Sequence, residues 1–338
     1  ETIQRTLDSL LSQDYPNYEI IVSDNCSDDN TAEIVKSYAS RGVRYYFNPK
    51  LEQWGESNWN YILTLAEGPF IALYHADDIY TSTMVRRQVE FLIKYPETSA
   101  VFTMSERIDR NDNPVRMGPI RLPRELKGKK IFHYEDFLNN VLKYGTFVVV
   151  PTMMTKRDVI DKVGLFRPEK YATASDIDLY LRMAKIGPIG VIDEPLHKYR
   201  IGSLATQQMF YQRTFIAHFF NVLDDYIADK SNSKLIKQNC LSVYKMSRAV
   251  DLIEIALNMI LKGQREKAKM TLEEAMQFKY IKTAINCAWG MRSRKVIHFL
   301  IGILMFISLF FRIDGLFSQA ISEAKRLRSS ILGRPIFQ

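Results

Sequence analysis

Apolar and polar residues follow two different periods in the first hundred residues of the chain. Short apolar runs, each followed by polar turn residues, predict strands at 19–23, 43–47, 70–75 and 100–104. Between these runs apolar residues recur every three or four positions, which predicts helices at 3–11, 31–38, 57–65 and 82–95. Strands that alternate with short helices form crossover units, so we expect an α/β fold with a mostly parallel sheet flanked by helices.

The hydrophobic pattern changes after residue 104. A polar stretch rich in Pro, Asp and Asn at 107–126 predicts a connecting loop. Strand and helix patterns then resume at 134–143, 146–150, 156–163 and 176–185. Beyond residue 205 the apolar spacing is helical, at 215–228, 235–259 and 264–277. We therefore expect an α/β domain at 1–204, an α-helical domain at 205–290 and a tail at 291–338.

Charge is unevenly distributed along the chain. Its 46 Lys and Arg residues exceed its 38 Asp and Glu residues, which gives a formal net charge of +8. Basic residues concentrate at 282–334, as expected of a segment that contacts an anionic surface. These residues flank an apolar stretch instead of alternating with exposed aromatic residues, so we expect no nucleic-acid partner. A membrane surface is the partner that fits this pattern.

The apolar stretch at 296–311 contains no Asp, Glu, Lys or Arg. A helix that spans a bilayer needs about 20 apolar residues, so this stretch is short for a span. Basic residues on both sides favour a helix that lies in the cytoplasmic leaflet. A buried helix and a spanning helix are the two alternatives.

Cysteine usage and the start of the chain bear on where the protein resides. The three cysteines contain no C-x-x-C pair, which disfavours a structural zinc site or a disulfide framework and fits a reducing cytosol. The chain begins in a helical pattern without an initiator Met or a signal peptide, so we expect its N-terminus to be truncated. The expected location is cytoplasmic, at the inner face of the cell membrane.

The first polar cluster, at 23–31, follows a predicted strand and precedes a helix. Asp29, Asn30 or Thr31 can cap that helix with a short polar side chain. Capping does not require Asp24, which ends the strand, where a carboxylate can accept a hydrogen bond from a nucleobase or a ribose. Helix capping and nucleotide binding are both open for this cluster.

The second cluster is His75-Ala76-Asp77-Asp78, again at the end of an apolar strand. Two adjacent carboxylates repel each other unless a positive group lies beside them. A divalent ion held by acids and substrate phosphates provides that charge, because Mg²⁺ and Mn²⁺ prefer oxygen ligands. The alternative is a turn whose acids cap the next helix.

The third cluster, Ser175-Asp176-Ile177-Asp178, opens a predicted helix. An Asp at a helix start is stabilised by the helix dipole, so capping alone accounts for it. A carboxylate fixed at a helix start beside a cleft can also act as a general base towards an acceptor hydroxyl.

The order and spacing of these clusters resemble a family 2 glycosyltransferase with the GT-A fold. Residues 20–31 are similar to the nucleotide-binding loop of that family, and His75-Ala76-Asp77-Asp78 resembles its D-x-D metal motif. The stretch 175–182 is similar to its E-D-x-D-L-W-L-R element, and 192–200 to the segment that follows. The resemblance covers about 1–204 and implies a nucleotide-binding half at 1–110 and an acceptor half at 111–204. It also implies that the family's first strand is missing.

The resemblance implies a role for each matched residue. Asp24 would contact the nucleobase with Asn25 beside it, and Asp77 would face the ribose and diphosphate. Asp78, together with His75, would hold Mn²⁺ or Mg²⁺, and Asp176 would be the catalytic base. Further substrate-binding residues would be Asn58, Asn60 and Asp178, and Gly55 and Trp59 would lie in the same loop beside the donor.

Three positions depart from the family pattern. His75 stands where many members have the first acid of D-x-D, and Ser175 replaces the acid before the base. A histidine that often follows the Tyr199-Arg200 pair is missing, and His197 is a candidate substitute or a simple hydrogen-bonded residue.

We expect an inverting, metal-dependent transferase that moves a sugar from a UDP- or dTDP-sugar donor to a glycan or lipid-linked acceptor. Nucleotidyl transfer is a rival enzyme class, and a non-catalytic nucleotide-sugar-binding or scaffolding module is a rival of another kind.

Overall fold

The computed structural model describes residues 2–50, 55–116, 118–201, 212–277 and 303–304. The chain forms two compact units. The first consists of Glu1–Leu138 and Thr146–Ile201, and the second of Asn139–Gly145 and Gly202–Gln338. The division of the C-terminal part into a helical domain and a tail stays a prediction.

The N-terminal part of the first unit is a small α/β layer. Helix α1 (Thr2–Leu11) precedes strand β1 (Ile20–Asp24), and helix α2 (Thr31–Ser37) connects β1 to the parallel strand β2 (Val43–Phe47). Apolar residues of both helices pack on the two strands, because each element has one apolar face. The buried members of this cluster are Ile3, Leu7, Ile20, Val35, Tyr38 and Val43.

A six-stranded sheet forms the centre of the first unit. Its strands are β3 (Phe70–Ala72), β4 (Ile79–Tyr80), β5 (Ala100–Ile108), β6 (Ile131–Phe132), β7 (Met153–Lys156) and β8 (Ile189–Arg200). The order is β3-β7-β5-β8-β4, with β6 also paired to β8. The two longest ladders of the unit, β5–β8 and β1–β2, are parallel, and the shorter ladders are antiparallel.

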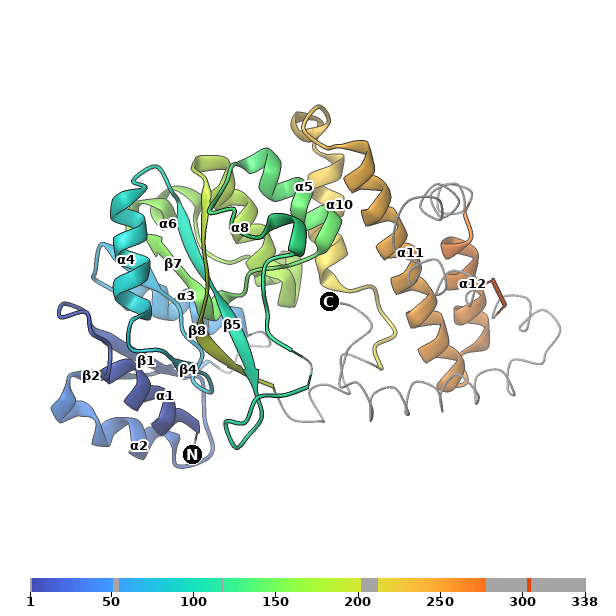
Figure 1. The fold of residues 1–338 in the computed structure, drawn as a ribbon. Coiled ribbons are helices and arrows are strands. Elements are labelled where there is room, and N and C mark those ends of the chain that lie inside the picture. The colour runs from blue at the N-terminus through green and yellow to red at the C-terminus, as the bar shows by residue number, and fades with distance from the viewer. Residues whose placement is uncertain (1, 51–54, 117, 202–211, 278–302, 305–338) are drawn as a thin grey trace. The chain divides into compact units, whose positions relative to one another are not determined.

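Helices flank this sheet (Figure 1). They are α3 (Gly55–Leu65), α4 (Met84–Lys94), α5 (Tyr134–Tyr144), α6 (Arg157–Val163), α7 (Pro168–Tyr171) and α8 (Ser175–Ile186). Helix α4 packs closely on β8 because Gly190 has no side chain: a Cβ atom there would lie 2.3 Å from the ring of Phe91. The expected α/β class with a flanked, mostly parallel sheet is confirmed.

Several element boundaries differ from the sequence-based prediction. The apolar run at 70–75 continues as strand only to Ala72, and β5 extends beyond 104 to Ile108. The predicted elements between 146 and 163 resolve into a 3₁₀ turn at Val150–Thr152, strand β7 and helix α6. Strand β8 was not predicted, because Pro195 and the charged residues at 193–194 obscure its apolar pattern.

A cavity of about 530 Å³ separates β1 from β3. Residues 20–23 of one strand and Phe70–Ala72 of the other line it, together with apolar residues of α1 and α3. No backbone ladder joins the two sheets among the described residues.

The described part of the second unit is helical, as predicted. Helices α10 (His218–Ala228), α11 (Gln238–Leu261) and α12 (Arg265–Ala275) lie close to the predicted ranges. The turn between α11 and α12 places Gly263 at φ 73°, a conformation that glycine adopts without steric cost.

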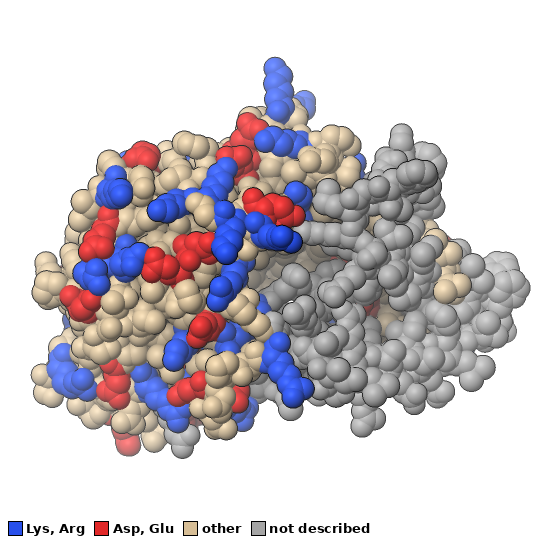
Figure 2. Space-filling view, in the orientation of Figure 1, with Lys and Arg blue, Asp and Glu red and all other residues tan. Residues whose placement is uncertain are grey.

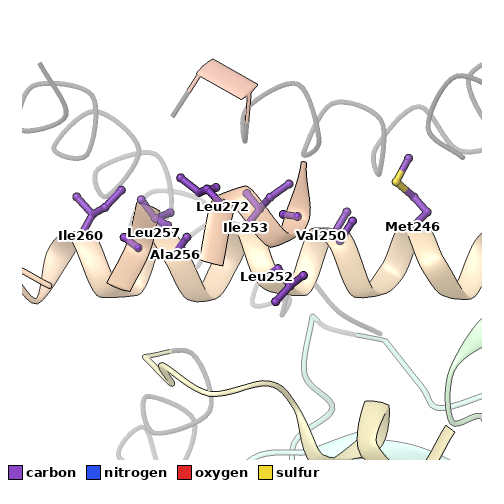
Figure 3. Packing of buried hydrophobic residues seen from close by; sticks show 11 residues of the cluster. Met246, Val250, Leu252, Ile253, Ala256, Leu257, Ile260 and Leu272 are labelled. Atoms are coloured by element: carbon purple, nitrogen blue, oxygen red, sulfur yellow. The ribbon is translucent and has the colours of Figure 1, made fainter. Parts of the chain in front are cut away.

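Helices α11 and α12 form a hairpin around a continuous apolar seam. Figure 3 shows Leu272 of α12 beside Ile253 and Leu257 of α11. Ala268 and Ala275, both fully buried, let the two helices approach closely. Near the middle of α11 the buried Asp251 forms an ion pair with Arg213.

Two predictions for the C-terminal region lie mostly outside the described residues: the basic tail and the apolar stretch at 296–311. Within the described ranges, no helix combines the length and the apolar character that a membrane span requires. On the face shown in Figure 2, Lys and Arg side chains are interspersed with Asp and Glu over the described surface.

Candidate functional site

Asp24 is the last residue of β1, and its side chain is 4% exposed. Its carboxylate accepts a hydrogen bond from the Tyr45 hydroxyl at 2.8 Å and another from the Ser27 backbone N–H at 2.9 Å. Burial acts to raise the pKa of Asp24, but the hydrogen bonds from Ser27 and Tyr45 outweigh it, so the pKa lies below its usual value. Asp24 is therefore an ionised, fixed carboxylate at the end of the strand.

The residues beside Asp24 are less constrained. Asn25 is half-buried, and its Oδ1 atom is buried without a hydrogen-bond partner among the described residues. Cys26 adopts a left-handed conformation at φ 60°, which L-amino acids rarely adopt, and its thiol donates to the Asn48 carbonyl.

The acidic loop at 75–78 connects β3 to β4, and neighbouring side chains hold its backbone. The Thr6 hydroxyl of α1 contacts the carbonyls of Asp78 and Ala76 at 2.7 and 3.0 Å. The Tyr80 hydroxyl accepts from the His75 N–H at 2.7 Å and lies 3.1 Å from the His75 carbonyl. These contacts fix the backbone that carries His75 and Asp78.

Asp78 is buried with both carboxylate oxygens engaged. Oδ2 lies 2.9 Å from Nε2 of His197, and Oδ1 accepts from the Arg200 backbone N–H at 2.7 Å. His197 is fully buried, and its Nδ1 atom lies 2.8 Å from the Ser105 hydroxyl. His197 is thus a hydrogen-bonded interior residue that holds Asp78.

His75 and Asp77 are the two ligand-bearing residues of the loop whose side chains are not fully buried. One candidate ligand atom from each of His75, Asp77 and Asp78 lies within 4.8 Å of the other two. Burial lowers the pKa of His75 to about 4, against the opposing effect of Asp78, so its imidazole is neutral near pH 7. A neutral imidazole and two carboxylates form a set that can bind a divalent metal ion.

Asp176 lies in the first turn of α8, and its Oδ1 accepts the backbone N–H of Ile177 at 2.7 Å. No ion pair to Asp176 occurs among the described residues, unlike Asp178 two positions later. Burial, with a further contribution from the charge of Glu56, raises the pKa of Asp176 to about 7. A carboxylate with this pKa can accept a proton near neutral pH.

Asp178 has a different environment from Asp176. Its side chain is fully buried, and it forms ion pairs with Arg167 and Arg182. The Arg182 guanidinium also donates to the carbonyl of Leu165 at 2.7 Å. The carboxylate therefore joins the start of α8 to the preceding loop, and a role in substrate binding for Asp178 stays a prediction.

Helix α3 connects the three clusters. Asn58 accepts from the Ser23 hydroxyl at 2.7 Å, beside Asp24. Trp59 stacks on the His75 ring at a centroid distance of 5.4 Å. Asn60 makes two hydrogen bonds to the backbone of Phe166, so its amide has a structural contact in the loop before α8.

Glu56, in the first turn of α3, was missed by the sequence analysis. It is 6% exposed, burial raises its pKa, and its charge acts on Asp176. In the sequence, the feature that could have indicated Glu56 is its position next to Gly55, in the loop that the resemblance places beside the donor.

The 530 Å³ cavity is lined by five residues of the candidate site: Ser23, Asn58, Trp59, His75 and Asp77. Asp24, Asp78 and Asp176 are not among the residues that line it.

Comparison with known proteins identifies the family. The model of glycosyl transferase family 2 matches residues 1–164. A glycosyltransferase of Methanocaldococcus jannaschii is 27% identical over 202 residues, which cover 59% of this chain and 66% of that protein. TuaG of Bacillus subtilis, named for teichuronic acid biosynthesis, is 25% identical over 203 residues, which cover 59% of this chain and 73% of TuaG.

Solved structures share the fold at lower sequence identity. TarS of S. aureus (residues 1–349) superposes with a TM-score of 0.59 at 16% identity, covering 95% of this chain and 88% of TarS. The structure of the same protein in complex with UDP-GlcNAc gives a TM-score of 0.62, also at 16% identity, with coverage of 94% and 88%. Residues 1–164 therefore belong to glycosyltransferase family 2.

Proposed function

We propose that the enzyme transfers a sugar from a UDP- or dTDP-sugar to a hydroxyl group of a glycan or lipid-linked acceptor, with inversion at the anomeric carbon. The observation that carries the proposal is the difference between two acids near helix α3, Asp24 and Asp176. The fixed carboxylate of Asp24 ends β1, and Asn58 of α3 accepts a hydrogen bond from the adjacent Ser23. Asp176, in contrast, has a pKa of about 7, as a general base requires.

In this mechanism Asp176 accepts the proton of the acceptor hydroxyl. The acceptor oxygen attacks the anomeric carbon, a new glycosidic bond forms, and the bond to the diphosphate oxygen breaks. The bonding electrons leave with the nucleoside diphosphate. A single displacement of this kind places the new bond on the face opposite the leaving group, so the configuration inverts.

Donor binding is assigned to the ends of β1 and β3. Asp24 and Asn25 would contact the nucleobase, and Asn25 offers an unpartnered amide oxygen for that purpose. Asp77 would face the ribose and diphosphate. His75 and Asp78 would hold Mn²⁺ or Mg²⁺, which when bound offsets the negative charge of the diphosphate. TarS, whose fold the chain shares, has been solved with UDP-GlcNAc, which supports the donor class.

The acceptor class and the location at the inner face of the membrane are proposed on other grounds. TuaG is named for teichuronic acid biosynthesis, and this supports a glycan acceptor. The basic and apolar residues at 282–334 support a site of action close to a lipid surface.

A non-catalytic nucleotide-sugar-binding or scaffolding module is the alternative. Ser175, which replaces an acid of the family pattern, is fully buried, and its hydroxyl has no partner among the described residues. This departure beside the proposed base favours the alternative.

Calorimetry of the full chain with UDP, dTDP and GDP, each with and without Mn²⁺, tests the proposal. We expect UDP or dTDP to bind only when Mn²⁺ is present, and GDP to serve as the weak-binding control. Asp78→Asn is expected to abolish the metal-dependent binding. If none of the nucleotides binds under any condition, the proposed function is wrong. If nucleotides bind and no donor sugar is released or transferred, the alternative module is correct.

A further inference from the structure

The connection from β5 to β6 carries an excess of positive charge. Residues 110–130 contain seven Lys or Arg residues and only two acids, Asp112 and Glu125. One of the seven, Lys129, pairs with Asp136 at 2.8 Å. The other six are exposed, and none of them forms an ion pair among the described residues. These six residues, which we call the basic surface, are Arg110, Arg116, Arg121, Arg124, Lys127 and Lys130.

The backbone of this connection is attached to the central sheet at both ends. Ser105 of β5 and Ile120 exchange two backbone hydrogen bonds, at 3.1 and 2.8 Å. The N–H of Val191 in β8 donates to the carbonyl of Lys130 at 2.8 Å. Between these points the side chain of Leu122 is buried. Because the fold already holds the backbone, little further ordering of the connection is needed when a ligand binds its basic side chains.

The start of the connection lies beside the acidic loop at 75–78. The Arg200 guanidinium donates to the carbonyl of Asp77 in that loop and to the carbonyl of Asp109, each at 2.6 Å. It also forms an ion pair with Asp112 at 2.6 Å. One of the two acids of the connection is therefore already paired. The basic surface thus begins at a segment that Arg200 joins to the candidate donor site.

The residue types of the connection indicate the chemistry of its partner. Four of the six basic residues are Arg, whose planar guanidinium binds a carboxylate or a phosphate through two parallel hydrogen bonds. The connection contains no aromatic residue on which a nucleobase could stack. None of its described Leu, Ile or Val residues is exposed, although insertion into a lipid surface depends on such residues. An anionic, polar partner is the class that fits.

We propose that the basic surface binds an acceptor glycan that carries negatively charged groups. This inference rests on the proposed function, because it names the chemical class of the acceptor. The charged groups of the glycan lie along 110–130, and its acceptor end lies towards the acidic loop, where the connection begins. Attraction between opposite charges also raises the rate at which the glycan encounters the enzyme.

Fluorescence anisotropy of the full chain with labelled polygalacturonate oligosaccharides tests the inference. Dextran oligosaccharides of the same length are the neutral control. We expect polygalacturonate to bind at least about tenfold more tightly than dextran in about 0.1 M salt. This advantage should disappear in about 1 M salt, because the screening length of exposed charges falls from about 10 Å to about 3 Å.

Two double variants show whether the basic surface is responsible. Arg121→Gln with Arg124→Gln should weaken polygalacturonate binding about five- to tenfold and leave Mn²⁺-dependent UDP binding intact. Lys36→Gln with Arg41→Gln removes two exposed charges elsewhere in the first unit and should change binding less than about twofold. Because basic residues at 282–334 also attract anions, the comparison of these two variants decides the inference.

The outcomes separate this inference from the proposed function. If dextran binds as tightly as polygalacturonate, or if the two double variants bind polygalacturonate equally, the inference is wrong, whatever UDP does. If polygalacturonate does not bind but vesicles of phosphatidylglycerol do, and Arg121→Gln with Arg124→Gln weakens that binding, the basic surface contacts a membrane and the inference is also wrong. A failure of every nucleotide to bind contradicts the proposed function alone, because the anion-binding surface is measured without a nucleotide.

Discussion

Two acidic segments of the first unit, 75–78 and 175–178, are divided in the same way. In each segment one carboxylate is fully buried and bound by the fold: Asp78 by His197 and the Arg200 backbone, Asp178 by Arg167 and Arg182. In each segment an earlier acid has no such partners. Asp77 is exposed, and Asp176 accepts the adjacent backbone N–H and interacts with Tyr180, with no ion-pair partner among the described residues.

This difference shows that adjacent acids in a motif can have separate tasks. A buried carboxylate needs a positive group or several hydrogen bonds, because removing a charge from water is costly. A carboxylate that must accept a proton or bind a ligand needs lone pairs that the fold leaves unused. The tertiary structure thus distinguishes an acid whose orientation the fold fixes from one that the fold leaves with few partners. Asp78, although fixed, has one contact on each carboxylate oxygen and keeps a lone pair on each for a metal ion.

The largest expected effect follows from removing the proposed base. Asp176→Asn should lower kcat by about 10²–10⁴-fold, the usual contribution of general base catalysis, and leave nucleotide binding intact. Steady-state kinetics and calorimetry measure the two quantities. If kcat is unchanged, Asp176 is not the base.

The same substitution should raise thermal stability at pH 8. The pKa of Asp176 is about 7 in the folded state and near 4 in the unfolded chain, so the free energy of unfolding falls as pH rises from about 4 to about 7 and stays at the lower value at pH 8. Below the pKa of the unfolded chain, near 4, both states carry a neutral carboxyl and the benefit should vanish. Melting curves of the wild type and Asp176→Asn at pH 4 and pH 8 would show this difference.

Asp178→Asn is expected to have the opposite effect on stability. Removing this carboxylate leaves Arg182 largely buried without its ion-pair partner, so unfolding should become easier by about 3 kcal/mol. Urea denaturation measures this loss. Asp158→Asn is the matched control, because Asp158 forms an exposed ion pair with Lys162 at 3.0 Å, and such pairs contribute less than about 1 kcal/mol. If the free energy of unfolding falls equally in the two variants, the conclusion that the fold depends on the buried ion pairs of Asp178 is wrong.

Glu56→Gln should produce the smallest effect, a shift in the pH profile. Burial is the main cause of the raised pKa of Asp176, and the charge of Glu56 adds to it. Without that charge Asp176 ionises at lower pH. In a plot of kcat against pH, the rise on the acidic side should therefore shift to lower pH by up to about one unit. Tyr180 and Tyr199 also interact with Asp176 and stay unchanged.

Glu33→Gln is the control for this measurement. Glu33 also lies in the first turn of a helix, α2, and its side chain is exposed. Its pH profile should match that of the wild type. A shift of the limb to higher pH in Glu56→Gln would show that Glu56 stabilises the charged form of Asp176.

Much of the first unit could be predicted from local patterns. The run at 43–47 is β2 without a change of boundary, and the helix predicted at 82–95 is α4, which spans Met84–Lys94. Strand β8 was not predicted because its pairing on both sides overrides a sequence that contains Pro195. The sequence predicts the three clusters of the candidate site. It indicates that residues 55–60 lie beside the donor, but not that they form a helix in contact with all three clusters.

The sequence by itself determined the α/β class, the helical C-terminal part and the positions of the acid clusters. These features depend on local periodicity and on residues within one turn or one strand end. Only the tertiary structure decided which acids are held and which are available. His197 and Asp78 are separated by more than a hundred positions, and Glu56 and Asp176 by a similar distance. Hydrogen bonds and burial between such distant residues leave no periodic signal in the chain, because they depend on how the elements pack.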